Sequence, residues 1–116
     1  MHVEWNKGDH AIHIDGRSHL LPGRVDQVME WPDRPLIAIL LEDSAGPQRL
    51  LVLDEHGQTR ARLGSPAGFD LYYLTPNSRY GITAVCTTEP PVDGWRDWQF
   101  AISLERGELV RVSPSR

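Results

Sequence analysis

The chain has 116 residues, of which 40% are hydrophobic and 24% charged, and its net charge is −4. This length suits a single domain, and this balance of apolar and charged residues is not that of a disordered chain. A net negative charge argues against binding to the phosphate backbone of a nucleic acid, and a single cysteine excludes an intramolecular disulfide.

The first predicted element is a β-hairpin. Two short segments, 10–14 and 17–21, flank an Asp-Gly dipeptide at 15–16, which is typical of a two-residue type I′ turn. Such a turn sets the register of the two strands and places Ile12 opposite His19.

The next two segments are one that fits a strand or a helical turn and one that is predicted to be a strand. Residues 24–31 fit either a strand or a short helical turn, and Pro32 and Pro35 then break any regular structure. Residues 36–41 are apolar at every position, which predicts a central strand with both faces buried. A loop over 43–48 follows.

The rest of the chain reads as short strands separated by turn signals. The Pro-rich segment 89–94 is predicted to be a rigid loop. The predicted strands are 49–54, 58–63, 69–74, 82–88, 98–104 and 109–113, and the first two and the last two of them pair as hairpins.

The predicted fold class is therefore all-β. We expect one domain over residues 1–116, with about eight short antiparallel strands and at most one short helix, because no long stretch has helical periodicity. An open sheet, a small sandwich or barrel, and blade-like sheets packed face to face all remain compatible with this pattern.

The three hairpins share a loose repeat. Each has a few apolar residues, a polar turn and a glycine, at Gly16, Gly57 and Gly107, with a spacing of about 40 to 50 residues. This pattern resembles the outer hairpins of β-propeller blades of the quinoprotein type. The chain is too short for a closed propeller, which needs about four or more blades of four strands.

The sequence predicts no membrane span and no secretory signal. The longest apolar run, 36–41, is far too short to cross a bilayer, and the first nine residues contain Glu4, Lys7 and Asp9 without an apolar run. Together with the single cysteine, these features favour a cytoplasmic location.

Two residue types could carry chemistry. His10 and His19 become diagonal neighbours in the predicted hairpin, but no third ligand lies near them in sequence, so solvated histidines are favoured over a metal site. Cys86 alternates with Ile82 and Ala84 and should point into the core, where a thiol is inert. No catalytic motif and no cofactor motif is recognisable, and we expect no cofactor.

The tryptophans are the best candidates for a binding site. Trp98 alternates with apolar residues and is predicted to be in the core, whereas Trp31 and Trp95 lie beside loops. There they either cap the core, which is the favoured interpretation, or stand exposed among charges, which is the composition of an interface hot spot. The candidate binding residues are Trp31, Arg34, Trp95, Arg96 and Asp97.

These observations favour a non-catalytic protein-binding module. In size and composition the chain resembles the small bacterial immunity proteins that neutralise a partner toxin, and this resemblance implies a basic protein partner. The alternatives are a small-molecule or sugar-binding module and an enzyme of an unrecognised family. We expect no nucleic acid or membrane partner, and self-association through unpaired edge strands is a further alternative.

Overall fold

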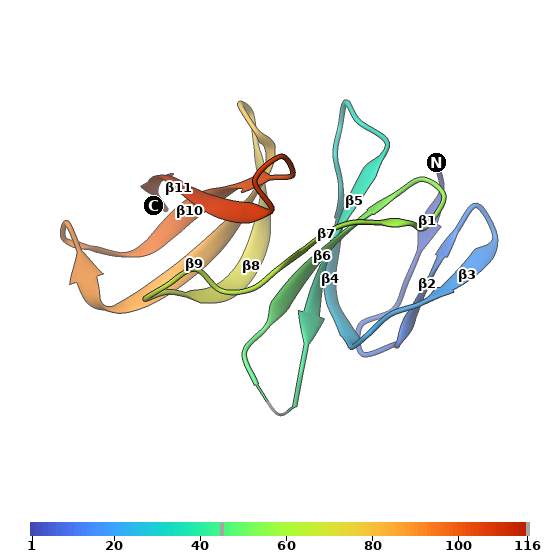
Figure 1. Ribbon diagram of the computed structural model, residues 1–116, viewed down its shortest axis with the longest axis horizontal. Coiled ribbons are helices and arrows are strands. Elements are labelled where there is room, and N and C mark those ends of the chain that lie inside the picture. Colours follow the sequence, from blue (N-terminus) through green and yellow to red (C-terminus); the bar gives the residue numbers. More distant parts are fainter. Residues whose placement is uncertain (45, 116) are drawn as a thin grey trace.

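The fold is all-β, as the sequence predicts. The structure, a computed structural model, describes residues 1–44 and 46–115, and these residues form eleven strands in three antiparallel sheets without a helix (Figure 1). The number of strands exceeds the eight that the sequence led us to expect. Residue 45, in the predicted loop 43–48, and residue 116, at the end of the predicted domain, lie outside the described residues.

Each sheet is a simple meander of consecutive strands. The N-terminal sheet contains β1 (Val3–Glu4), β2 (Ala11–Ile14) and β3 (Arg17–Leu20). The central sheet contains β4 (Arg24–Glu30), β5 (Leu36–Glu42), β6 (Arg49–Asp54) and β7 (Thr59–Leu63). The C-terminal sheet contains β8 (Asp70–Asn77), β9 (Gly81–Val92), β10 (Trp95–Ser103) and β11 (Glu108–Pro114).

The central sheet lies between the other two and is buried on both faces. Along β5, Ile37 and Ile39 pack with Ile12 of the N-terminal sheet, whereas Ala38 and Leu40 belong to a second core that contains residues of the C-terminal sheet. Alternate residues of a strand point to opposite faces, so a strand between two layers must be apolar throughout. This explains the uninterrupted apolar run at 36–41.

The first hairpin has the predicted turn and register. Asp15 and Gly16 both have positive φ, 49° and 81°, as a type I′ turn requires, and Ile12 is paired with His19. A second Asp-Gly turn at 93–94, with φ values of 49° and 83°, joins β9 to β10. The same dipeptide rule would have found this second hairpin.

The structure decides one open alternative and differs from two expectations. Residues 24–31, which fitted either a strand or a helical turn, contain strand β4. The sequence did not predict β1, a two-residue strand too short to leave a periodic pattern. The predicted loop over 89–94 is wrong, because β9 continues to Val92. Thr87 pairs with Asp97, and Val92 pairs with Trp95. Residues 88–91 of β9 therefore lie opposite a single residue of β10, Arg96. Such an irregular register tolerates prolines, which lack the N–H that a regular ladder uses.

A side-chain amide joins the central and C-terminal sheets. Gln27 of β4 donates from Nε2 to the carbonyl oxygen of Leu74 in β8, at 2.8 Å, and its Oε1 accepts the Leu74 N–H at 2.7 Å. Both strands are sheet edges, so Gln27 acts as a substitute for a neighbouring strand. The Gln27 side chain thus provides hydrogen-bond partners for both the N–H and the C=O of Leu74, which is buried.

We expect Gln27→Ala to lower the free energy of unfolding by about 1–2 kcal/mol, because it leaves two backbone groups of Leu74 without a partner. Urea denaturation measures the change. Gln58→Ala is the matched control, since Gln58 is exposed and uses its backbone rather than its side chain in hydrogen bonds. Equal stability of the two variants would show that the Gln27 bridge contributes nothing.

Candidate functional site

Trp31 caps the core, which confirms the interpretation that the sequence favoured for it. Its side chain is 7% exposed and belongs to the core between the central and C-terminal sheets. The indole Nε1 donates to the carbonyl oxygen of Tyr80 at 3.3 Å. The ring lies directly against the backbone of Gly81, where an added Cβ would be 2.7 Å from the indole Cδ1. Trp31 therefore holds the β4–β5 turn against the start of β9.

Arg34 is on the surface next to this capped corner. The β4–β5 turn is closed by hydrogen bonds from Trp31 N to Leu36 O and from Leu36 N to Arg34 O, at 3.0 and 2.8 Å. Arg34 is exposed and lines an open recess of about 410 Å³ together with Asp33 and Arg79. The turn thus presents charge to solvent while its tryptophan is buried.

The second predicted group lies at the β9–β10 hairpin. Trp95 is 39% exposed, so the core-capping interpretation that the sequence favoured is wrong for this tryptophan. Arg96 forms an ion pair of 3.7 Å with Glu89 in which both side chains face solvent. Asp97 is half-buried and pairs with Thr87 across the two strands. Charged residues therefore follow a partly exposed indole in the sequence of this hairpin.

Trp98 lies beneath this hairpin and is buried, as predicted. Its Nε1 donates to the carbonyl oxygen of Trp95 at 3.1 Å, and the guanidinium of Arg111 stacks over its ring at 4.7 Å from the centroid. A buried indole whose N–H is satisfied holds the backbone of Trp95 in place.

The structure does not bring the five predicted residues together. Trp31 contacts Gly81 at the first residue of β9, whereas Asp97 pairs with Thr87 of the same strand. Six residues of strand separate these two positions, which corresponds to about 20 Å. The residues therefore form two surface groups, one with Arg34 and one with Trp95, Arg96 and Asp97.

The sequence analysis missed two exposed aromatic side chains near the second group. Tyr72 and Tyr73 of β8 are 57% and 39% exposed, and their rings pack edge to face with centroids 5.0 Å apart. The register of β8 against β9 shifts between Leu71 and Tyr73, so two successive tyrosines reach the surface. Tyr73 and Trp95 lie roughly 15 Å apart by strand spacing and rise. We call Tyr72, Tyr73 and Trp95 the aromatic surface.

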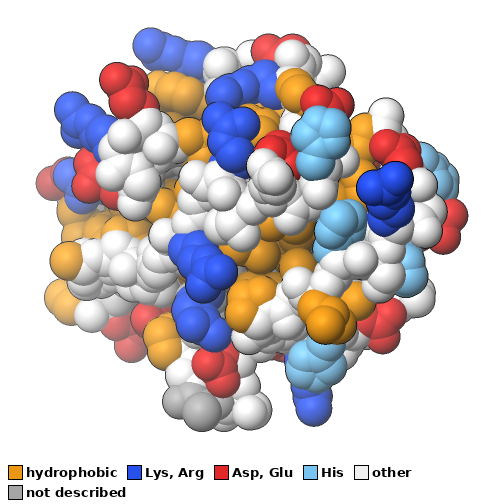
Figure 2. Space-filling view, turned by 45° about the vertical axis from the view of Figure 1, so that its right-hand side comes forward, with side chains coloured by type: hydrophobic (Ala, Val, Ile, Leu, Met, Phe, Trp, Pro, Cys, Tyr) orange, Lys and Arg blue, Asp and Glu red, His pale blue; other side chains and the backbone are white. Residues whose placement is uncertain are grey.

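The histidines do not converge on a site. His10 and His19 line different recesses, the first with Glu42 and the second with Glu55 and His56. Within 1–44 and 46–115, no three His, Cys, Asp or Glu side chains are grouped as a metal site would require. Figure 2 shows the histidines spread over one part of the molecular face.

Cys86 points into the core, as its alternation with apolar residues indicated. Its side chain is 0% exposed, and burial, with a smaller contribution from the charge of Asp70, raises its pKa to about 12. The thiol is therefore neutral and inaccessible, and thus unsuited to act as a nucleophile.

A cleft that the sequence did not reveal opens on the central sheet. Its volume is about 250 Å³, and we call it the arginine cleft after two of the residues that line it. The part used below consists of Pro22, Leu41, Arg49, Leu51 and Arg62. Cross-strand pairing explains this grouping, because Leu41 pairs with Arg49 and Leu51 pairs with Arg62 across β5, β6 and β7. The residues are distant in sequence, so no local motif marks them.

Comparisons with known proteins do not assign the chain to a family. No family model, no curated protein and no solved structure matches it. A search of the described residues for a helix long and apolar enough to cross a membrane found none.

Proposed function

We propose that this chain is a non-catalytic module that binds a partner protein through the aromatic surface. The observation that supports the proposal is the exposure of three aromatic side chains, Tyr72, Tyr73 and Trp95, on one sheet. Aromatic residues are enriched in interface cores, because they bury a large area at a low cost in side-chain entropy. A spacing of roughly 15 Å fits within a single interface of standard size.

The surroundings of Trp95 support its role as the anchor. Arg96 and Asp97 flank it in sequence, and Glu89 pairs with Arg96 at the rim. A tryptophan with a polar rim is the usual composition of a hot spot. In this proposal Arg34 belongs to the periphery, and Trp31 acts indirectly by holding the turn that presents Arg34.

The partner is proposed to be a basic protein. The net charge of −4 would attract such a partner and speed association more than it would strengthen the final complex. A small acidic protein that covers a basic toxin would act in this way, as the immunity proteins that the chain resembles in size and composition do.

The test is an affinity pull-down of the tagged protein from the lysate of its own host, read by mass spectrometry. We expect a stoichiometric basic partner. Trp95→Ala should weaken binding of that partner at least tenfold, since removal of a hot-spot side chain costs about 2 kcal/mol or more.

Trp5→Ala is the matched control. Trp5 is 37% exposed, nearly the same as Trp95, but it lies in the N-terminal segment at the opposite end of the molecule (Figure 1). Retention of the partner by Trp5→Ala and its loss by Trp95→Ala would support the proposal. Recovery of no partner, or equal recovery with both variants, would refute it.

A further inference from the structure

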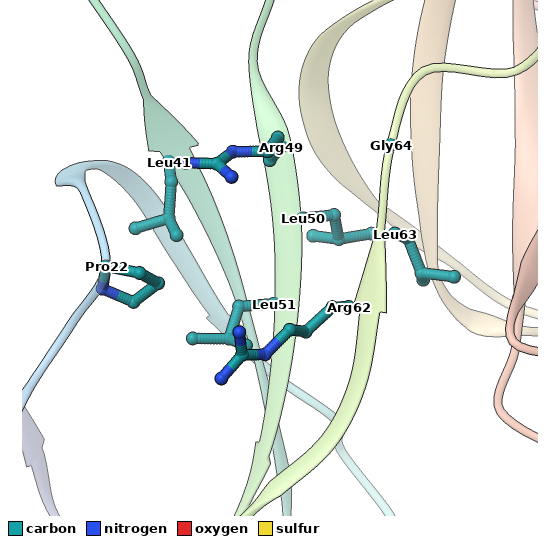
Figure 3. A pocket seen from close by; sticks show the side chains of 8 residues that line it. All are labelled: Pro22, Leu41, Arg49, Leu50, Leu51, Arg62, Leu63 and Gly64. Atoms are coloured by element: carbon teal, nitrogen blue, oxygen red, sulfur yellow. The ribbon is translucent and has the colours of Figure 1, made fainter.

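The arginine cleft has an apolar floor and two cationic walls. Leu41 and Leu51 are 2% and 3% exposed and belong to the core between the N-terminal and central sheets. Arg49 and Arg62 extend over the same face of the sheet, toward Leu41, Leu51 and Pro22 (Figure 3). The cleft thus combines a hydrocarbon surface with guanidinium groups in a small concave space.

Among the described residues, one of the two guanidinium groups has no carboxylate counter-ion. No ion pair within 1–44 and 46–115 joins Arg62 to a carboxylate. Arg49 contacts Asp43 at 3.5 Å, in a pair whose side chains are 52% and 39% exposed. Exposed pairs of this kind are worth about 1 kcal/mol or less, so an anionic ligand can compete for Arg49.

We infer that the arginine cleft binds a small carboxylate that carries a short hydrocarbon chain. The carboxylate would accept hydrogen bonds from Arg62, with Arg49 nearby, and the chain would lie on Leu41, Leu51 and Pro22. The volume of about 250 Å³ is slightly below the range of about 300–1,000 Å³ usual for ligand pockets, which favours a small ligand. This inference does not depend on the proposed protein partner, whose surface is on another sheet.

The lining favours a carboxylate over a phosphate. A guanidinium presents two parallel N–H groups that match one planar carboxylate. Phosphate sites typically add backbone N–H groups from a glycine-rich loop or a helix N-terminus, and the described residues contain no helix. The leucine floor would in addition leave most phosphate oxygens without a donor.

The test is a titration of the ¹⁵N-labelled protein with hexanoate, followed by the amide shifts of Leu41, Arg49, Leu51 and Arg62. We expect saturable shifts with a dissociation constant on the order of 1 mM, which is typical of so small a ligand. Acetate has the charge without the chain, and hexanol has the chain without the charge. Each should bind at least ten times more weakly than hexanoate.

Two variants separate the cleft from general charge. Arg62→Gln should weaken hexanoate binding at least tenfold. Arg60→Gln is the matched control, because Arg60 is exposed on the same strand but does not line the cleft, and it should leave the binding unchanged. Normal dispersion of the spectrum shows that each variant is folded.

Three results with hexanoate or the variants would overturn the inference. They are the absence of saturable shifts with hexanoate, equal binding of hexanol and hexanoate, and equal weakening by the Arg60 and Arg62 variants. If inorganic phosphate bound as tightly as hexanoate, a small carboxylate would also be rejected as the ligand. The same would follow if an acidic peptide bound and hexanoate did not. None of these outcomes depends on the pull-down that tests the protein partner.

Discussion

Trp31→Ala is expected to lower the free energy of unfolding by about 3–5 kcal/mol, the usual cost of truncating a buried aromatic side chain to alanine. The variant removes the indole from the core, together with its hydrogen bond to the carbonyl oxygen of Tyr80 and its packing contact with the backbone of Gly81. Few neighbours can collapse into the space, because the indole lies against backbone. Urea denaturation followed by circular dichroism measures the change.

Two other variants give reference values for this loss of unfolding free energy. Trp95→Ala removes the same side chain from a position that is 39% exposed, and it should cost less than about 1 kcal/mol. Trp31→Phe retains an aromatic ring but loses the N–H group and should fall between the two alanine variants. If Trp31→Ala and Trp95→Ala destabilise the protein equally, Trp31 does not cap the core.

Stability should fall steeply above pH 9 because of Cys86. Burial raises the pKa of its thiol from an ordinary 9.0 to about 12, so the folded protein keeps the proton while the unfolded chain releases it. The unfolded state is then favoured as the pH rises. The free energy of unfolding should lose on the order of 1 kcal/mol from this group between pH 8 and pH 10, and more toward pH 12.

Cys86→Ala isolates the effect, since alanine does not titrate. The tyrosines and lysine contribute to both proteins and cancel in the comparison. The difference in unfolding free energy between wild type and variant, measured by urea denaturation at several pH values, should shift by on the order of 1 kcal/mol from pH 8 to pH 10. A difference that stays constant with pH would mean that the folded thiol ionises normally.

Local rules were sufficient for much of the fold. The Asp-Gly turn at 15–16 specified both the φ values and the register of the first hairpin, and the apolar run at 36–41 indicated a strand buried on both faces. These predictions hold because turn geometry and side-chain alternation act over a few neighbouring residues.

The same rules failed where a strand is irregular. The prolines at 90–91 suggested a loop, but they lie in a long bulge of β9, and a bulge also exposes Tyr72 beside Tyr73. A bulge shifts the alternation by one residue and is decided by the partner strand rather than by the residues themselves.

The amino-acid sequence by itself determined the all-β class, the three predicted hairpins and the buried positions of Trp98 and Cys86, because each depends on short-range periodicity or turn chemistry. The tertiary structure alone decided which residues from distant parts of the chain lie together on the surface and in the core. It separated Trp31 from Trp95, joined Gln27 to Leu74, and brought Arg62 and Leu41 into the lining of one cleft. Such contacts arise from the stacking and twist of whole sheets, which bring together residues tens of positions apart and leave no signal in either segment alone.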